Sequence, residues 1–286
     1  MNEMDIVKIF VATHKPGSFF SNEVYTPIHV GRAISKYKKE MAHIMGDDTG
    51  DNISEKNSSF NEMTAHYWIW KNVKDVKYVG LCHYRRLFGI DITPATIEVI
   101  MKDTDVIMVE PIYRTDSVYS CFCRFVAGED MTILAQVIKK KYPDYYSTLI
   151  YLCSGIKYHP FNMLICSKEL YDQYAEWMFS ILFECEKYIK PSPYANGKRT
   201  IGYLAEMISQ VYFIHNHKKI KSVPYYKIEG DNKILISHSF LGDLRMKFQE
   251  LLLNTVFLDK VKKDIPLKFS NPAIVNGLKS DGIIIE

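Results

Sequence analysis

Apolar runs and helix-like segments alternate along the first 110 residues of this chain. Short runs rich in β-branched and aromatic residues cover Lys8–His14, Val76–Cys82 and Val106–Val109, and each indicates a strand. Between them, Asn61–Lys71 and a segment from Ile97 to Asp103 have the apolar spacing of helices. Alternating strands and helices are typical of a mostly parallel sheet, because parallel neighbours need a crossover connection. We therefore expect an α/β fold.

The later part of the chain adds helices to this pattern. A strand candidate, Phe161–Cys166, precedes a long helical segment, Lys168–Lys190, whose apolar face carries Tyr171, Tyr174, Trp177, Met178, Ile181 and Leu182. Helices are also predicted at Met131–Lys141, Arg199–Phe213 and Phe240–Phe257, and a short strand at Val223–Tyr226. We expect one α/β domain over residues 1–228, and a C-terminal helical extension, residues 229–286, packed on it.

The run that begins at Val76 ends abruptly in four polar residues, His83, Tyr84, Arg85 and Arg86. Open α/β sheets bind ligands just outside the carboxyl ends of their strands. Paired arginines suit phosphate because each planar guanidinium donates two parallel hydrogen bonds. Alternation along the strand places His83 and Arg85 on one face and Tyr84 and Arg86 on the other, so only one of the two arginines is expected to reach the phosphate. The pattern predicts a site for a phosphate-rich small molecule.

Composition argues against several classes of protein. The net charge is only +3 over 286 residues, without a long basic block, which argues against a nucleic-acid groove. The six cysteines include no Cys-x-x-Cys pair, so a reducing cytoplasm is expected rather than a disulfide framework. The acidic N-terminus lacks the apolar segment of a signal peptide. No stretch reaches the roughly 18 apolar residues of a membrane span, so any membrane contact is expected to be peripheral.

Several longer motifs, in a fixed order between about Lys8 and Pro224, resemble one known family. The matching pieces are Thr26–Gly31, Gly50–Ser54, Asn57–Asn72, Val79–Arg86, Asn162–Met163, Glu176–Phe179 and Arg199–Glu206. With these motifs the chain resembles the bacterial capsular and exopolysaccharide glycosyltransferases that carry a domain first catalogued as being of unknown function. Some members of that family are β-galactofuranosyltransferases with a GT-A-like, Rossmann-like fold.

The resemblance implies a GT-A-like sheet flanked by helices and a transferase that takes a hexosyl unit from a UDP-sugar. The implied donor is UDP-galactofuranose, although residue spacing does not distinguish a furanose from a pyranose. The implied acceptor is a hydroxyl of a glycan, such as a lipid-linked oligosaccharide in capsule, exopolysaccharide or O-antigen synthesis, attacked in line with inversion. Relatives commonly carry a His a few residues before the acid of the helix near Asp130. This chain has Ala127–Asp130 there, which puts acceptor binding and specificity in question.

GT-A enzymes usually hold the donor diphosphate through a divalent cation bound by an Asp-x-Asp motif. The corresponding strand here ends in arginines, which can neutralise the diphosphate themselves and stabilise charge on the leaving group. We therefore expect no cofactor and no metal site, with at most a weak dependence on Mg²⁺ or Mn²⁺. The alternative is that each of Arg85 and Arg86 merely forms an ion pair with a nearby acid.

Further donor contacts are expected near the other motifs. The polar loop before the aromatic helix holds Asp51, Asn52, Ser54 and Asn57, whose side chains suit hydrogen bonds to a nucleotide and equally suit turns and helix caps. Thr13 and His14 close the first strand, which in nucleotide-sugar enzymes faces the uracil and ribose. Glu62 stands beside an apolar helix face, and a buried carboxylate needs a partner.

An inverting transfer needs a base that accepts the proton of the acceptor hydroxyl, and a carboxylate is the usual choice. The candidates are Glu129, Asp130 and Glu206, although a first-turn acid also favours the helix dipole. Arg199, a candidate donor contact, precedes Glu206 by seven residues, or two helical turns, so both fall on one helix face. There they either contact the same ligand or pair with each other. Asn162 is a candidate acceptor contact.

The sequence is also compatible with two other functions and with a location at the membrane surface. A non-catalytic carbohydrate-binding or assembly subunit would bind nucleotide or glycan without releasing UDP, and a phosphohydrolase would use His83 and the arginines on phosphoesters. The Lys-rich segments Lys36–Lys39 and Lys260–Lys263 suit anionic lipid headgroups on the inner face of the plasma membrane, at roughly 1 kcal/mol per basic residue. Solvated helix faces explain them equally well.

Overall fold

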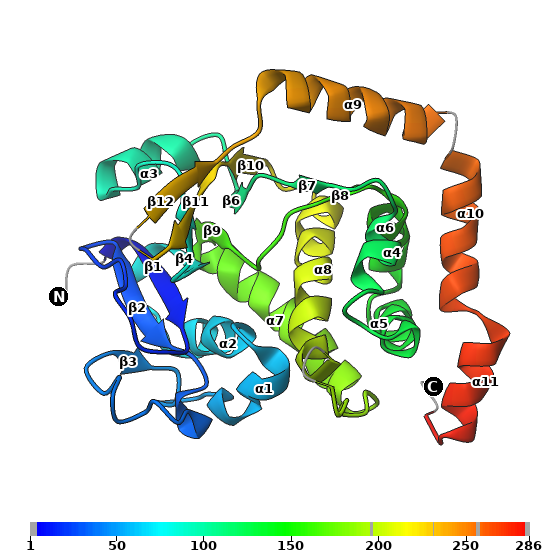
Figure 1. The fold of residues 1–286 in the computed structure, drawn as a ribbon, viewed down its shortest axis with the longest axis horizontal. Helices are drawn as coiled ribbons and strands as arrows, with labels where there is room; N and C mark the ends of the chain where they lie inside the picture. Colours follow the sequence, from blue (N-terminus) through cyan, green and yellow to red (C-terminus); the bar gives the residue numbers. More distant parts are fainter. Residues whose placement is uncertain (1–4, 195–196, 231, 256–257, 284–286) are drawn as a thin grey trace. The chain divides into compact units, whose positions relative to one another are not determined.

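The computed structural model describes residues 5–194, 197–230, 232–255 and 258–283 (Figure 1). The chain divides into two compact units. The first unit comprises residues 1–110, 159–176 and 217–237, and the second comprises residues 111–158, 177–216 and 238–286. Among the described residues, no helix combines the length and the apolarity that crossing a bilayer requires. The domain boundary after residue 228 stays a prediction.

The first unit contains the central sheet, whose strands lie in the order β10-β6-β9-β4-β1-β2-β3 (Figure 1). These strands are β1 Asp5–Thr13, β2 Tyr25–His29, β3 Met45–Gly46, β4 Val76–His83, β6 Val106–Val109, β9 Leu164–Ser167 and β10 Ile220–Val223. All neighbours are parallel except β9, which runs antiparallel to both β4 and β6. The predicted α/β fold with a mostly parallel sheet is therefore confirmed.

Helices bury both faces of this sheet. Phe10 of β1 meets Trp68 of α2 (Met63–Asn72) edge to face, with ring centroids 5.8 Å apart. On the opposite face, Ile9 joins one buried cluster with Ile97 of α3 (Pro94–Met101). Alternation along a strand sends successive side chains to opposite faces, so an uninterrupted apolar run is what a doubly covered strand requires. This is why the apolar runs located the strands correctly.

The strand after Val76 does not continue to Arg86 as predicted. It ends at His83, and a two-residue turn at Tyr84 and Arg85 leads into β5 (Arg86–Phe88), where Arg86 pairs back with His83. A further hairpin, β11 (Tyr225–Glu229) and β12 (Asn232–Ile236), adds antiparallel partners to β5. The predicted assignment of these four residues to alternate faces of one strand is therefore wrong, because the backbone reverses at the turn.

The start of α2 also differs from expectation. Asn57 does not cap that helix, because residues 57–60 form a separate short helix, α1 (Asn57–Phe60). The cap position of α2 is Glu62, whose side chain makes no capping hydrogen bond. By contrast, α3 begins with a capping box in which Thr93 and Thr96 satisfy each other's backbone N–H groups.

The second unit is mainly helical. Its helices are α4 Val118–Phe122, α5 Gly128–Lys141, α6 Pro143–Ser154, α8 Thr200–His215, α9 Phe240–Thr255, α10 Leu258–Phe269 and α11 Pro272–Ser280, with α7 Lys168–Glu186 shared between the units. Strands β7 (Ile112–Tyr113) and β8 (Lys157–Tyr158) pair in a small separate sheet. Helix α5 ends at Lys141 as predicted, but α6 begins at Pro143 and was not predicted. Proline suits the first position of a helix, where its missing N–H costs nothing.

Replacing Gly80 by Ala is expected to destabilise the fold. A Cβ at Gly80 would lie 2.6 Å from the carbonyl oxygen of Leu164 in the adjacent β9, and backbone in the centre of a sheet cannot move aside. We expect a loss of about 1–3 kcal/mol, measured as a lower urea midpoint. Gly17→Ala is the matched control, because its new Cβ makes only ordinary contacts with Phe19. Equal midpoints for the two variants would contradict this account of β4 and β9.

Candidate functional site

The carboxyl ends of β1 and β4 bring the first predicted site residues together. The two strands are parallel, and Ala12 stands opposite His83 in the register. The ring of Tyr84 lies edge to face with the ring of His14 at 5.5 Å and with that of Phe19 at 6.1 Å. His14 is exposed, whereas Thr13 is fully buried and its hydroxyl donates to the Lys15 carbonyl at 3.3 Å.

The two arginines occupy different surroundings, because Arg85 lies within the turn and Arg86 begins β5. Arg85 is exposed, with its guanidinium 5.2 Å from the ring centre of Tyr84. Arg86 is half-buried, and its guanidinium lies over the ring of Phe161 at 4.0 Å. None of the ion pairs found in the described part of the chain involves either arginine. The geometry therefore leaves both cations available for an anion, and it does not support the alternative of structural ion pairs.

Two consecutive residues before β9 have a left-handed backbone, Phe161 at φ 79° and Asn162 at φ 52°. This conformation is costly for a bulky side chain and persists only where neighbours enforce it. Both carbonyls are held by imidazoles: His83 Nε2 lies 2.7 Å from the Phe161 oxygen, and His66 Nε2 lies 2.9 Å from the Asn162 oxygen. The end of β4 and helix α2 therefore fix this turn from two sides.

The predicted site residues Glu62 and Asn162 contact each other at this turn. The Asn162 amide, which is buried, donates to Glu62 Oε1 at 2.8 Å, which favours a supporting role for Asn162 over direct acceptor contact. Burial lowers the pKa of His66 to about 4, so its ring is neutral. Because Nε2 must donate to a carbonyl, Nδ1 accepts from the Tyr171 hydroxyl at 2.7 Å. Sequence analysis missed His66, because a single His on an apolar helix face carries no motif.

A buried carboxylate organises the polar loop. Asp47 is fully buried and accepts hydrogen bonds from the backbone N–H groups of Gly31 at 2.8 Å and Arg32 at 3.1 Å, and from the Ser54 hydroxyl. These bonds join the loop after β2 to the loop that precedes α1. The Ser54 hydroxyl therefore stabilises the fold, in agreement with the alternative that these loop residues form turns and caps.

The neighbouring loop residues are also held by the protein. Asn52 Oδ1 accepts from the Ser54 N–H at 3.2 Å, and the Asn57 amide donates to the Asn61 carbonyl at 2.6 Å. Asp51 is exposed and accepts from the Tyr67 hydroxyl at 3.0 Å. Turn formation therefore accounts for the contacts of Asn52 and Asn57. Asp51 is the loop residue whose carboxylate lies at the surface.

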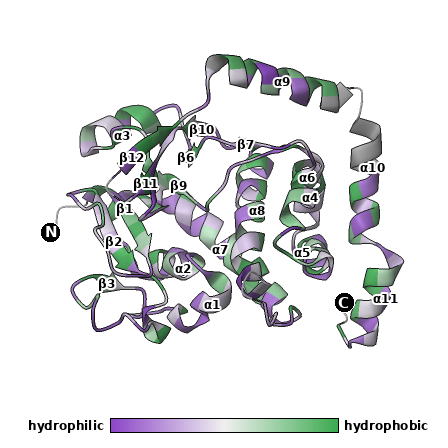
Figure 2. Ribbon diagram, in the orientation of Figure 1, coloured by the Kyte–Doolittle hydropathy of each residue, from purple (hydrophilic) through white to green (hydrophobic). Residues whose placement is uncertain are grey.

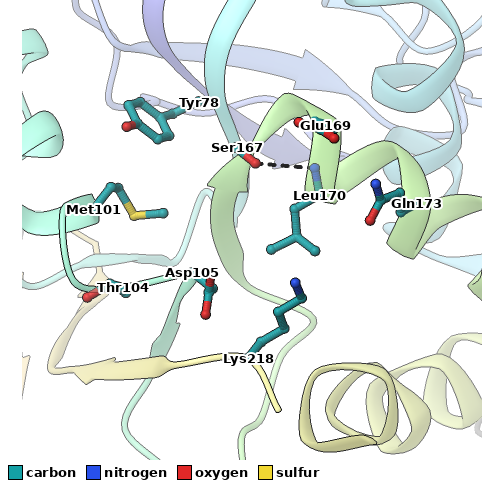
Figure 3. Close-up of a pocket in the computed structure, with 9 residues that line it drawn as sticks. All are labelled: Tyr78, Met101, Thr104, Asp105, Ser167, Glu169, Leu170, Gln173 and Lys218. Carbon is teal, nitrogen blue, oxygen red and sulfur yellow. Dashed lines mark hydrogen bonds between the residues drawn. The ribbon is translucent and has the colours of Figure 1, made fainter. Parts of the chain in front are cut away.

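A cavity of about 350 Å³ opens at the opposite end of the strands from the arginines (Figure 3). Its lining comprises Tyr78, Met101, Thr104, Asp105, Ser167, Glu169, Leu170, Gln173 and Lys218. Tyr78 lies near the start of β4 and Asp105 lies just before β6, so the cavity is at the amino ends of the parallel strands. No predicted site residue lines it, and it is not the candidate donor site.

In the second unit, Asp130 lies in the first turn of α5 and is half-buried. Burial raises the pKa of its carboxyl to about 6, and the nearby charge of Glu129 acts in the same direction. The Thr200 hydroxyl lies 3.4 Å from Asp130 Oδ2, a weak contact that opposes the shift. Glu129 is exposed. A carboxylate whose pKa lies near neutrality suits general base catalysis, so Asp130 is the stronger base candidate.

Aromatic rings that the sequence did not single out lie near this carboxylate. Phe125, 41% exposed, stacks on Tyr203 with ring centres 5.2 Å apart and an interplanar angle of 24°. The guanidinium of Arg199 lies 5.5 Å from the Tyr203 ring centre. Arg199 is followed directly by Thr200, which contacts Asp130, so the aromatic pair, a cation and the carboxylate belong to one neighbourhood.

Arg199 does not lie within the same helix as Glu206, contrary to the sequence prediction. Arg199 ends a 3-10 turn, η3 (Gly197–Arg199), and α8 begins only at Thr200. Glu206 lies two turns into α8 and is half-buried. Tyr203 follows Arg199 by four residues, and this spacing is the signal by which sequence analysis could have found it.

Among the described residues, no three His, Cys, Asp or Glu side chains gather so that they could hold a metal ion. Metal independence stays a prediction. The candidate residues form two groups. The donor candidates other than Arg199, together with Asn162, lie in the first unit. Arg199 and the base candidates lie in the second.

Comparisons with known proteins identify similar sequences and structures. A family model described as "Domain of unknown function (DUF4422)" matches residues 8–218. The apo structure of WbbM, a bifunctional glycosyltransferase, is similar at a TM-score of 0.68 and 27% identity. The match covers 82% of this chain and 48% of that protein, so this chain spans about half its length. No curated protein matches this chain. The likeness agrees with the predicted GT-A-like fold.

Proposed function

Because this chain belongs to the DUF4422 family, we propose that it is a glycosyltransferase that moves a hexosyl unit from a UDP-sugar to a glycan hydroxyl. The observation that carries the proposal is the structural likeness to a glycosyltransferase over most of this chain. The galactofuranosyl donor, the lipid-linked acceptor and the inverting displacement are further parts of the proposal, and they rest on the family resemblance of the motifs.

The donor site proposed is the carboxyl end of β1 and β4. Arg85 is exposed there and Arg86 is half-buried, and the described ion pairs include neither, so they can bind the diphosphate of the donor. Two guanidinium cations would also stabilise the charge that develops on UDP as it leaves. His14 and Tyr84, whose rings pack together at the same ends of the strands, would contact the nucleoside.

The acceptor side proposed is the neighbourhood of Asp130. An ionised Asp130 would take the proton of the attacking hydroxyl, and Phe125 with Tyr203 would present an aromatic surface to the acceptor sugar. Glu129 and Glu206 are the alternative bases. Arg199, which the sequence predicted as a donor contact, lies beside Tyr203 and in this proposal would instead hold a hydroxyl or an anionic group of the glycan.

The test is UDP release from purified protein, measured with and without a galactose-terminated acceptor and with UDP-galactofuranose and UDP-galactopyranose as donors. We expect release to depend on both donor and acceptor. Binding without release would favour the non-catalytic subunit. Attack on phosphoesters with no acceptor requirement would favour the phosphohydrolase.

Replacing Phe125 by Ala is expected to raise the KM for the acceptor about tenfold, which corresponds to about 1.4 kcal/mol, with kcat and the donor KM little changed. The physical reason is the loss of apolar ring surface from the acceptor side. Tyr151→Ala is the matched control, since it removes an exposed aromatic ring from helix α6 of the same unit. Equal acceptor KM values for both variants would remove Phe125 from the acceptor site.

A further inference from the structure

Helix α9 (Phe240–Thr255) exposes its apolar face. Leu241, Leu244, Phe248 and Leu251 recur at intervals of three and four residues, which places them in one stripe along the helix. All four are 57–75% exposed. Hydrophobic and hydrophilic residues alternate along α9 in Figure 2, as an amphipathic helix requires. An amphipathic helix of a globular protein normally turns such a stripe toward the core.

The acidic side of α9 faces the protein instead. Asp243 Oδ1 lies 3.0 Å from His238 Nδ1, and His238 in turn lies 5.9 Å from the ring of Tyr113 in β7. Burial raises the pKa of Tyr113, and the negative charges of Glu250 and Asp243 add to the effect. The contact of α9 with His238 is thus made by Asp243, on a side of the helix away from the exposed apolar stripe.

Basic side chains border the apolar stripe. At 3.6 residues per turn, Arg245 falls just beyond one edge of the stripe and Lys247 just beyond the other. Both are exposed. A leucine and phenylalanine stripe between two cationic borders matches the boundary of an anionic bilayer, where apolar groups enter the acyl region and cations meet headgroups.

We propose that α9 docks this protein on the surface of an anionic membrane. A second copy of the chain is a poorer fit, because two-fold pairing of the stripe would bring the cationic borders of both copies together. The Lys-rich segments are weaker candidates. Lys38 is paired with Asp48 at 2.9 Å, and the side chains of Lys260–Lys263 lie outside the described residues.

The experiment is flotation of the full chain with vesicles of phosphatidylcholine alone or mixed with phosphatidylglycerol. We expect flotation only with the anionic vesicles, weakened by salt, and at least a tenfold loss of bound protein for the double variant L244E/F248E. Val99→Glu is the matched control, because Val99 is an equally exposed apolar residue on α3 and its change should leave flotation unaltered. R245E/K247E should lose the preference for anionic vesicles.

Each remaining outcome overturns the proposal. Parent protein that stays in the bottom fraction with both vesicles, or an equal loss for Val99→Glu, removes the membrane role. A dimer in solution that L244E/F248E converts to monomer, without flotation, assigns the stripe to a second copy. A lower melting temperature for L244E/F248E, again without flotation, assigns it to the chain's own core. No donor or acceptor is present, so these results are independent of the proposed glycosyl transfer.

Discussion

Replacing Asp130 by Asn is expected to lower kcat about 10²–10⁴-fold, the range typical for loss of a general base. The amide keeps the shape of the side chain but cannot accept the proton of the acceptor hydroxyl. The measurement is acceptor-dependent UDP release at saturating substrates. Asp144→Asn is the matched control, because Asp144 is an exposed acid in the first turn of the next helix, α6.

The pH profile gives the same prediction a second readout. Only the ionised carboxylate can act as a base, so the rate of the parent should rise with pH up to about 6 and then level off, following the raised pKa of Asp130. The Asn variant should lose this acidic limb. If Glu129→Gln or Glu206→Gln loses the limb and Asp130→Asn keeps it, the base is one of those residues.

Thermal stability separates this loss from misfolding. The pKa of Asp130 is raised in the fold, so its ionised form is disfavoured there, and that cost is present above the pKa of the unfolded chain. An amide removes the cost, and the melting temperature of Asp130→Asn at pH 7 should be equal to or above that of the parent. A lower melting temperature would instead indicate a structural role.

Replacing Arg85 by Ala is expected to lower kcat/KM for the donor about 10²–10³-fold, comparable to removal of one electrostatic group that stabilises a transition state. Arg85 is the better member of the pair to test, because its guanidinium lies over the ring of its neighbour Tyr84, whereas that of Arg86 packs on Phe161. Arg85→Lys should recover only part of the loss, since an ammonium keeps the charge without the bidentate geometry. Arg124→Ala, an exposed arginine of the second unit, is the control.

Metal dependence belongs to the same prediction. If guanidinium groups neutralise the diphosphate, the parent should keep full activity in EDTA, and added Mn²⁺ or Mg²⁺ should rescue little of the Arg85→Ala loss. An absolute requirement of the parent for either cation would contradict the metal-independent transfer that we propose.

Patterns local to the sequence predicted much of the fold. The strand at Val106–Val109 and the apolar face of α7 were located correctly, because the period of buried residues follows from strand and helix geometry alone. Helix α6 was missed because Tyr142-Pro143 ends one helix and begins another in the same two residues. Strand β12 went unpredicted, and its residues 232–235 are all exposed, so no buried period marks it.

The candidate site could be predicted only as a set of residues. His83, Tyr84 and the arginines stand in one motif, but the reversal of the chain at Tyr84 depends on the pairing of β5 with β11, far along the sequence. The stacking of Phe125 on Tyr203 likewise joins positions 78 residues apart. Neither partner carries a local signal of the other.

The sequence by itself determined the α/β class, the apolar runs that form the sheet and the polar residues that follow β1 and β4, because side-chain period and chain order are local properties. Only the tertiary structure decided the antiparallel course of β9, the left-handed turn at Phe161 and Asn162, and the pKa of Asp130. Strand pairing, enforced backbone strain and desolvation are all free energies of contact between distant segments. They exist only once the chain has folded.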